Sequence, residues 1–129
     1  MENRGLIPTY AHGILDYLGA ILLLIAPNIF GFADLNSAVE YIPRLIGFLV
    51  LFQAIVTDYE LGVFRVLPFK VHKTVDIIVG LYLAVSPFIH GFSELPLAYW
   101  LPHVAVGVAV LFATLISKTY PEYRLESAT

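Results

Sequence analysis

The chain contains four long runs of residues that are almost free of charge. The runs 17–33, 77–93 and 95–117 contain no Asp, Glu, Lys or Arg, and the run 41–57 is interrupted only by Arg44. A helix needs about 20 mostly apolar residues to cross the hydrocarbon core of a bilayer. We therefore predict an all-α, integral membrane four-helix bundle. Its predicted helices lie near 11–32, 38–58, 71–90 and 96–118.

The composition excludes several classes of protein. Hydrophobic residues make up 59% of the chain and charged residues 13%, whereas an ordinary soluble domain has about 25% charged residues. The shortage of charge therefore favours a membrane protein. The net charge of −3 and the scattered bases do not fit a nucleic-acid-binding groove. The absence of Cys excludes disulfides and thiolate metal ligands.

The basic residues are distributed unevenly around the four runs. Arg4 precedes the first run, Arg65 lies between the second and third, and Lys118 follows the last. The connections 33–40 and 91–95 contain neither Lys nor Arg. Because Lys and Arg are enriched in cytoplasmic loops of membrane proteins, we predict that the N- and C-termini and the central connection are cytoplasmic.

The sequence also contains an internal repeat, in which residues 12–32 align without gaps on residues 72–92. The shared positions are His12 and His72, Asp16 and Asp76, Pro27 and Pro87, and the steps Gly31-Phe32 and Gly91-Phe92. Each copy contains two spans, so both copies have the same orientation. We predict a pseudo-two-fold axis along the membrane normal.

The repeat also suggests a division of the chain. We predict a single membrane domain over 1–129, with repeat one at about 10–60 and repeat two at about 70–120. The central connection, at about 59–71, is expected to be a cytoplasmic loop or short helix at the membrane interface, because it mixes apolar residues with bases.

Each copy has a Pro near the end of its first span, within Ser86-Pro87-Phe88 and Ala26-Pro27-Asn28. With the Gly-Phe step that follows, this pattern resembles the SPW-repeat family of small bacterial membrane proteins, whose two-helix repeats carry Ser-Pro-Trp at this place. The second copy has Phe in place of Trp, and the first keeps only the Pro. The resemblance covers about 10–118. It implies a helical bundle in the bacterial inner (cytoplasmic) membrane and no particular activity.

Two His/Asp pairs are the main candidates for chemistry. His12 and Asp16 are four residues apart, as are His72 and Asp76, so each pair lies on one face of its helix. Pseudo-symmetry would bring two imidazoles and two carboxylates together near the cytoplasmic ends of the first and third spans. Groups of this kind at converging positions bind a divalent metal or relay a proton.

A structural role explains the same pairs. Each His would donate to the Asp of the other repeat and so hold the two helices together. Each Asp also lies near the expected start of a helix, where free amide groups and the helix dipole favour a carboxylate. We favour this structural brace over the metal site, although a duplicated brace and a duplicated ligand set would have the same sequence.

Two further polar residues, Arg44 and His103, occupy equivalent places near the outer starts of the second and fourth spans. An Arg at this depth binds an anion or a lipid phosphate, or extends to the headgroups, or pairs with an acid. We expect Arg44 to reach the headgroups or to pair with Glu40.

The sequence contains no motif that indicates a particular reaction or cofactor. It lacks a nucleophile elbow, a P-loop, a dinucleotide-binding fingerprint and a zinc-protease motif. This absence speaks against an enzyme. It favours a non-catalytic structural or accessory component, such as a subunit of a larger membrane complex or of a homo-oligomer. Two alternatives stay open. One is a binding or transport module for a proton or divalent metal. The other is a membrane enzyme acting on a lipid or quinone.

Overall fold

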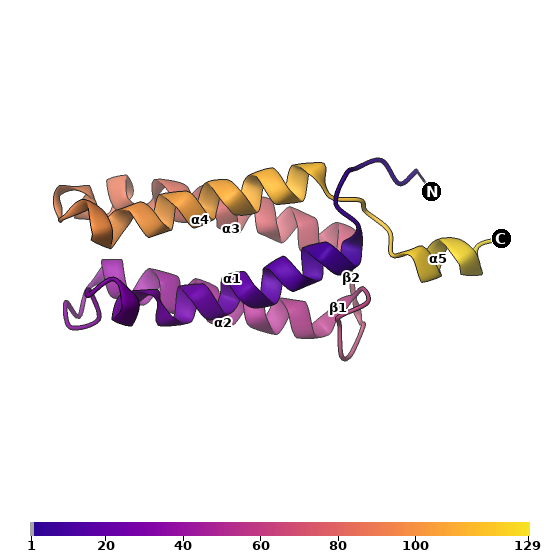
Figure 1. Ribbon diagram of the computed structural model, residues 1–129, viewed down its shortest axis with the longest axis horizontal. Helices are drawn as coiled ribbons and strands as arrows, with labels where there is room; N and C mark the ends of the chain where they lie inside the picture. Colours follow the sequence, from indigo (N-terminus) through magenta and orange to yellow (C-terminus); the bar gives the residue numbers. More distant parts are fainter. Residues whose placement is uncertain (1) are drawn as a thin grey trace.

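The computed structural model describes residues 2–129 as a bundle of four long helices (Figure 1). They are α1 (Thr9–Ile29), α2 (Ala38–Val56), α3 (Phe69–Ile89) and α4 (Leu97–Ile116). At 1.5 Å per residue they are about 28–32 Å long, close to the thickness of the hydrocarbon core. All four are long and apolar enough to cross a membrane. The predicted four-helix membrane bundle is confirmed, with each helix end within three residues of its predicted place.

The helices form two hairpins, which lie one above the other in Figure 1. The helix α1 packs mainly on α2, and α3 packs mainly on α4. The turns within the hairpins lie at one end of the bundle, which we call the hairpin end. Both termini and the α2–α3 connection lie at the other end, which we call the terminal end. The two repeats therefore share one orientation, as predicted.

Small residues allow the helices of each hairpin to pack closely. A Cβ atom added to Gly47 would lie 3.0 Å from the backbone oxygen of Ala20, and one added to Gly107 would lie 2.7 Å from that of Gly80. These two contacts occupy equivalent places in the two repeats. In lipid, such close approach of backbones is a main source of helix association.

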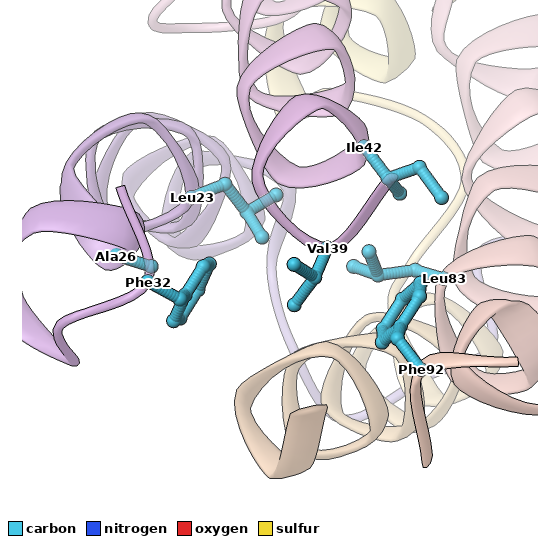
Figure 2. Close-up of a cluster of buried hydrophobic side chains, with 7 residues drawn as sticks. All are labelled: Leu23, Ala26, Phe32, Val39, Ile42, Leu83 and Phe92. Carbon is cyan, nitrogen blue, oxygen red and sulfur yellow. The ribbon is translucent and has the colours of Figure 1, made fainter. Parts of the chain in front are cut away.

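The duplicated Gly-Phe step ends the first helix of each repeat. Gly31 and Gly91 have φ values of 81° and 75°, the left-handed conformation that glycine adopts readily at a helix C-terminus. The following residues, Phe32 and Phe92, are buried. Figure 2 shows both rings in one apolar cluster at the hairpin end. The cluster contains Leu23, Ala26, Phe32, Val39, Ile42, Leu83 and Phe92.

Four short elements lie outside the long helices, three in the connections and one after α4. At the terminal end, β1 (Thr57–Asp58) pairs in parallel with β2 (Leu67–Pro68). The 3-10 helix η1 (Phe92–Glu94) lies in the α3–α4 turn, and α5 (Glu122–Ser127) follows α4. The α2–α3 connection is thus a loop whose ends are joined by a strand pair, and the helical alternative for it is wrong. The helix α5 was not predicted.

The outward faces of the bundle are apolar. Large side chains on all four helices are more than 60% exposed, including Leu18, Phe48, Ile78 and Phe112. A chain with such a surface is suited to a lipid bilayer, because lipid tails cover apolar side chains at no cost.

Candidate functional site: a buried His/Asp tetrad

The fold brings His12, Asp16, His72 and Asp76 together near the terminal end, and we call this group the tetrad. Across the repeats, His12 Nε2 lies 2.9 Å from Asp76 Oδ2, and His72 Nε2 lies 3.2 Å from Asp16 Oδ2. Within each repeat, the nearest nitrogen–oxygen distances are 3.3 Å for His12 to Asp16 and 3.1 Å for His72 to Asp76. All four residues are at least 92% buried.

The carboxylates do not lie in the first turn of their helices. Asp16 and Asp76 are each the eighth residue of their helix, because α1 begins at Thr9 and α3 begins at Phe69. The free amide groups of a helix belong to its first four residues. The expectation that a helix N-terminus favours these carboxylates is therefore wrong, since each Asp lies about two turns into its helix, beyond the free amide groups. Side chains surround the carboxylates instead.

Hydroxyl groups show that Nδ1 of each histidine carries a proton. Ser117 Oγ lies 2.7 Å from His12 Nδ1, and its own proton is donated to the backbone oxygen of Ala113 at 2.6 Å. A hydroxyl has only one proton to donate, so Ser117 accepts a hydrogen bond from His12 Nδ1–H. The Nε2 atom of His12 is therefore the one that faces the carboxylates.

The second histidine has the same arrangement. Thr57 Oγ1 lies 2.7 Å from His72 Nδ1 and donates its proton to the backbone oxygen of Gln53 at 2.6 Å. His72 Nδ1–H must then donate to Thr57, and His72 Nε2 faces the carboxylates. This Nε2 atom is fully buried and makes no hydrogen bond.

Three further side chains donate to the carboxylates. Gln53 Nε2 donates to Asp76 Oδ1 at 2.9 Å, and Thr114 Oγ1 donates to Asp76 Oδ2 at 3.3 Å. Tyr59 donates its hydroxyl proton to Asp16 Oδ2 at 2.8 Å. Burial and the adjacent Asp16 carboxylate raise the pKa of Tyr59 well above its usual value. Tyr59 therefore remains a proton donor at neutral pH.

An aromatic layer covers the tetrad at the terminal end. The ring centroid of Phe69 lies 5.0 Å from that of His12 and 5.1 Å from that of His72. Tyr59 packs on Phe69, and neither ring is more than 3% exposed. This layer separates the tetrad from the water at that end.

Sequence reasoning did not identify the partners of the tetrad, which are Gln53, Thr57, Tyr59, Thr114 and Ser117. One signal was present. Thr57 lies as many residues after His12 as Ser117 lies after His72. Each of these two hydroxyl residues comes at the end of an otherwise apolar span. An alignment of the two repeats over their full length could therefore have identified these two hydroxyl residues. The other partners have no counterpart in the opposite repeat.

Arg44 and His103 lie away from the tetrad, towards the hairpin end. Arg44 is 3.5 Å from Glu40 and donates to the backbone oxygen of Leu24 at 2.7 Å and to Asn28 Oδ1 at 3.0 Å. The expected pairing with Glu40 is therefore observed. His103 is buried, and its Nε2–H donates to the backbone oxygen of Val39 at 2.9 Å. Both side chains connect helices.

The electrostatics of the tetrad require additional positive charge. With a proton on Nδ1 alone, each imidazole directs the lone pair of Nε2 towards carboxylate oxygens at 2.9–3.3 Å. Two neutral imidazoles and two carboxylates carry a charge of −2 in a buried site, which is very unfavourable. One divalent cation, or one proton on each Nε2, would make the site neutral.

Comparison with known proteins gives a family assignment. The model of the SPW repeat domain matches residues 10–117 of the chain. No curated protein and no solved structure matches it.

Proposed function

The chain belongs to the SPW repeat family, and we propose that it is a small, non-catalytic membrane protein whose tetrad binds one divalent transition-metal ion. The single observation that carries this proposal is the direction of the two histidines. Each Nδ1 donates to a hydroxyl that has no other proton to give, so each Nε2 faces the two carboxylates and is free to bind either an ion or a proton.

The donor set fits such an ion in type and spacing. Two imidazole nitrogens and two carboxylate oxygens suit Zn²⁺ and neighbouring divalent ions. With bonds of about 2.0–2.2 Å, the ligand atoms of a tetrahedral ion are about 3.3–3.6 Å apart. The nitrogen–oxygen distances of the tetrad are 2.9–3.3 Å, and one ligand atom from each of the four residues lies within 4.8 Å of the others, so small shifts of the side chains would admit the ion.

The surroundings of the ligands also support the proposal. Histidine ligands of metals characteristically donate their other N–H group to an oxygen acceptor, and ligating carboxylates are themselves hydrogen-bonded. Here Thr57 and Ser117 accept from the histidines, and Gln53 and Tyr59 donate to the carboxylates.

A site closed by four protein ligands is typical of a structural metal. The ion would connect α1 with α3, and so repeat one with repeat two, within a single membrane domain. By the distribution of Lys and Arg, the tetrad would lie near the cytoplasmic side of a bacterial inner membrane, with both termini cytoplasmic.

The test is metal analysis of protein purified in mild detergent, stripped with a chelator and reloaded with Zn²⁺ or Co²⁺. We expect one ion per chain in the wild type and none in Asp76→Asn or His72→Gln. We expect tetrahedral Co²⁺ absorption bands in the wild type. The matched control is His90→Gln, which changes a histidine outside the tetrad. Circular dichroism shows whether each variant is folded.

The second candidate is a metal-free brace within a structural or accessory subunit. The observation that favours it is the 2.9 Å distance between His12 Nε2 and Asp76 Oδ2, which suits a hydrogen bond with a proton on Nε2. If folded wild type binds less than one tenth of an ion per chain after reloading, the metal proposal is wrong and the brace is retained.

A further inference from the structure

The two repeats differ along one face of their second helices. The helix α2 carries Leu45, Leu49 and Gln53, and the equivalent positions of α4 carry only alanine. These positions are Ala105, Ala109 and Ala113. Three large side chains of α2 are therefore absent from the equivalent face of α4.

A groove of about 350 Å³ lies at this place, between α1 and α4. This volume is in the range of small-molecule sites. Its walls include Leu18 and Leu22 of α1 and Ala105 and Ala109 of α4. Leu18 is 61% exposed and Ala109 is also exposed, so the groove opens through the side of the bundle towards lipid.

One end of the groove is polar, because His12, Asp16, Asp76 and Thr114 line it. Asp76 Oδ1 accepts a hydrogen bond from Gln53. In the other repeat Ala113 replaces Gln53 and has no amide to give. Within residues 2–129, no amide or hydroxyl group donates a hydrogen bond to Asp16 Oδ1, since Tyr59 donates to Oδ2. The Nε2 atom of His12 lies 3.3 Å from Asp16 Oδ1. Asp16 is 92% buried and lines the groove.

We propose that this groove binds an uncharged lipid alcohol, with its apolar chain between α1 and α4 and its hydroxyl group donating to Asp16. The hydroxyl would replace the amide that Gln53 supplies in the other repeat. The ligand must come from the bilayer, because Tyr59 and Phe69 cover the tetrad at the terminal end.

The charges at the polar end select the head group. Two carboxylates lie there, and none of the described residues that line the groove is Lys or Arg. A phosphate or carboxylate head would find no Lys or Arg among these residues to pair with and would be left as an unpaired buried charge, which is costly. A hydroxyl group donates a proton to a carboxylate without bringing a charge. This inference does not depend on a metal, since Asp16 Oδ1 accepts equally in the protonated brace.

The experiment uses a long-chain alkanol that carries a diazirine in its chain, with the fatty acid of the same chain as the second probe. Purified full-length protein in detergent is irradiated with each probe, and the labelled peptides are mapped by mass spectrometry. We expect the alkanol to label α1 and α4 along the groove, and unlabelled alkanol to compete. Labelling by the fatty acid should be weaker by about tenfold or more, because its carboxylate would be buried without a cationic partner.

Two variants fill the groove with the residues of the other repeat. Ala109→Leu restores the leucine of α2 in the apolar part, and Ala113→Gln places an amide beside Asp16. Each should lower alkanol labelling by about tenfold or more, through lost apolar contact or a lost hydrogen bond. The matched control is Ala98→Leu, an exposed position of α4 outside the groove, which should leave labelling unchanged.

Ala113→Gln leaves all four tetrad residues in place, so its metal content separates this proposal from the metal site. Equal labelling by alkanol and fatty acid, or unchanged labelling in a folded Ala113→Gln protein, would overturn the proposal. If Ala109→Leu does not fold, Ala113→Gln alone decides the question.

Discussion

Thr57 and Ser117 occupy the same position in the two repeats, and each accepts a hydrogen bond from the histidine of the other repeat at 2.7 Å. The exchange is reciprocal, so each hairpin holds an imidazole that belongs to its neighbour. The hydroxyls therefore orient the histidines and also join the repeats. An isolated repeat would lack both the hydroxyl for its histidine and the second Asp.

Removal of either hydroxyl should weaken metal binding without removing a ligand. In Thr57→Val and Ser117→Ala, the histidine loses the acceptor that orients it, and such losses lower metal affinity by about 10–100-fold. Zn²⁺ affinity is measured by competition with a chromophoric chelator. Thr74→Val is the control, because Thr74 is exposed and bonds only to its own helix. Equal affinity in all variants would show that the hydroxyls do not orient ligands.

A methyl group at the closest helix contact should destabilise the second hairpin. A Cβ on Gly107 would lie 2.6 Å from the backbone nitrogen of Ala84, and backbone atoms cannot move aside independently. We expect Gly107→Ala to lower stability by about 1–3 kcal/mol, measured as thermal unfolding in detergent. The control is Gly19→Ala, whose added Cβ meets nothing within 4 Å and should raise stability slightly.

The helix α5 should be released when Asp58 is neutralised. Tyr123 donates to Asp58 Oδ1 at 2.6 Å, and Arg124 donates to Asp58 Oδ2 at 2.8 Å. Asp58→Asn weakens both contacts, and exposed pairs of this kind contribute about 1 kcal/mol or less. We expect cleavage by trypsin after Arg124 to become a few times faster. An unchanged rate would mean that these contacts do not hold α5 in place.

The same contact predicts how the docking of α5 depends on pH. Burial and the hydrogen bond to Asp58 raise the pKa of Tyr123 above its ordinary value of 10.0. The folded state thus favours the protonated phenol, so this stabilisation is present below about pH 10 and is lost as pH rises through the folded pKa. Trypsin protection relative to a Tyr123→Phe control should be constant from neutral pH to about pH 10 and decrease above it.

The orientation in the membrane can be tested directly because the chain contains no Cys. We expect Leu35→Cys, at the hairpin end, to react with an impermeant maleimide on intact cells. Ser127→Cys, at the terminal end, should react only after permeabilisation. The unsubstituted chain is the control for background labelling. The reverse pattern would place both termini outside and contradict the distribution of Lys and Arg.

Several features could be read directly from the residues. The four spans follow from long uncharged runs, because a bilayer accepts only segments that are apolar for about 20 residues. The repeat follows from matched positions such as Pro27 and Pro87, and the shared orientation follows from two spans per repeat. The identities of the tetrad residues were also predictable, since duplicated His and Asp are conspicuous in apolar helices.

The contacts of the tetrad could be decided only by the tertiary structure. That His12 faces Asp76 depends on the rotation and separation of the two hairpins. These are set by many apolar contacts, such as the cluster around Leu83 and Phe92, and a uniformly apolar sequence does not encode them in any local pattern. The groove arises in the same way, because an alanine such as Ala113 creates space only where packing places it opposite Asp16.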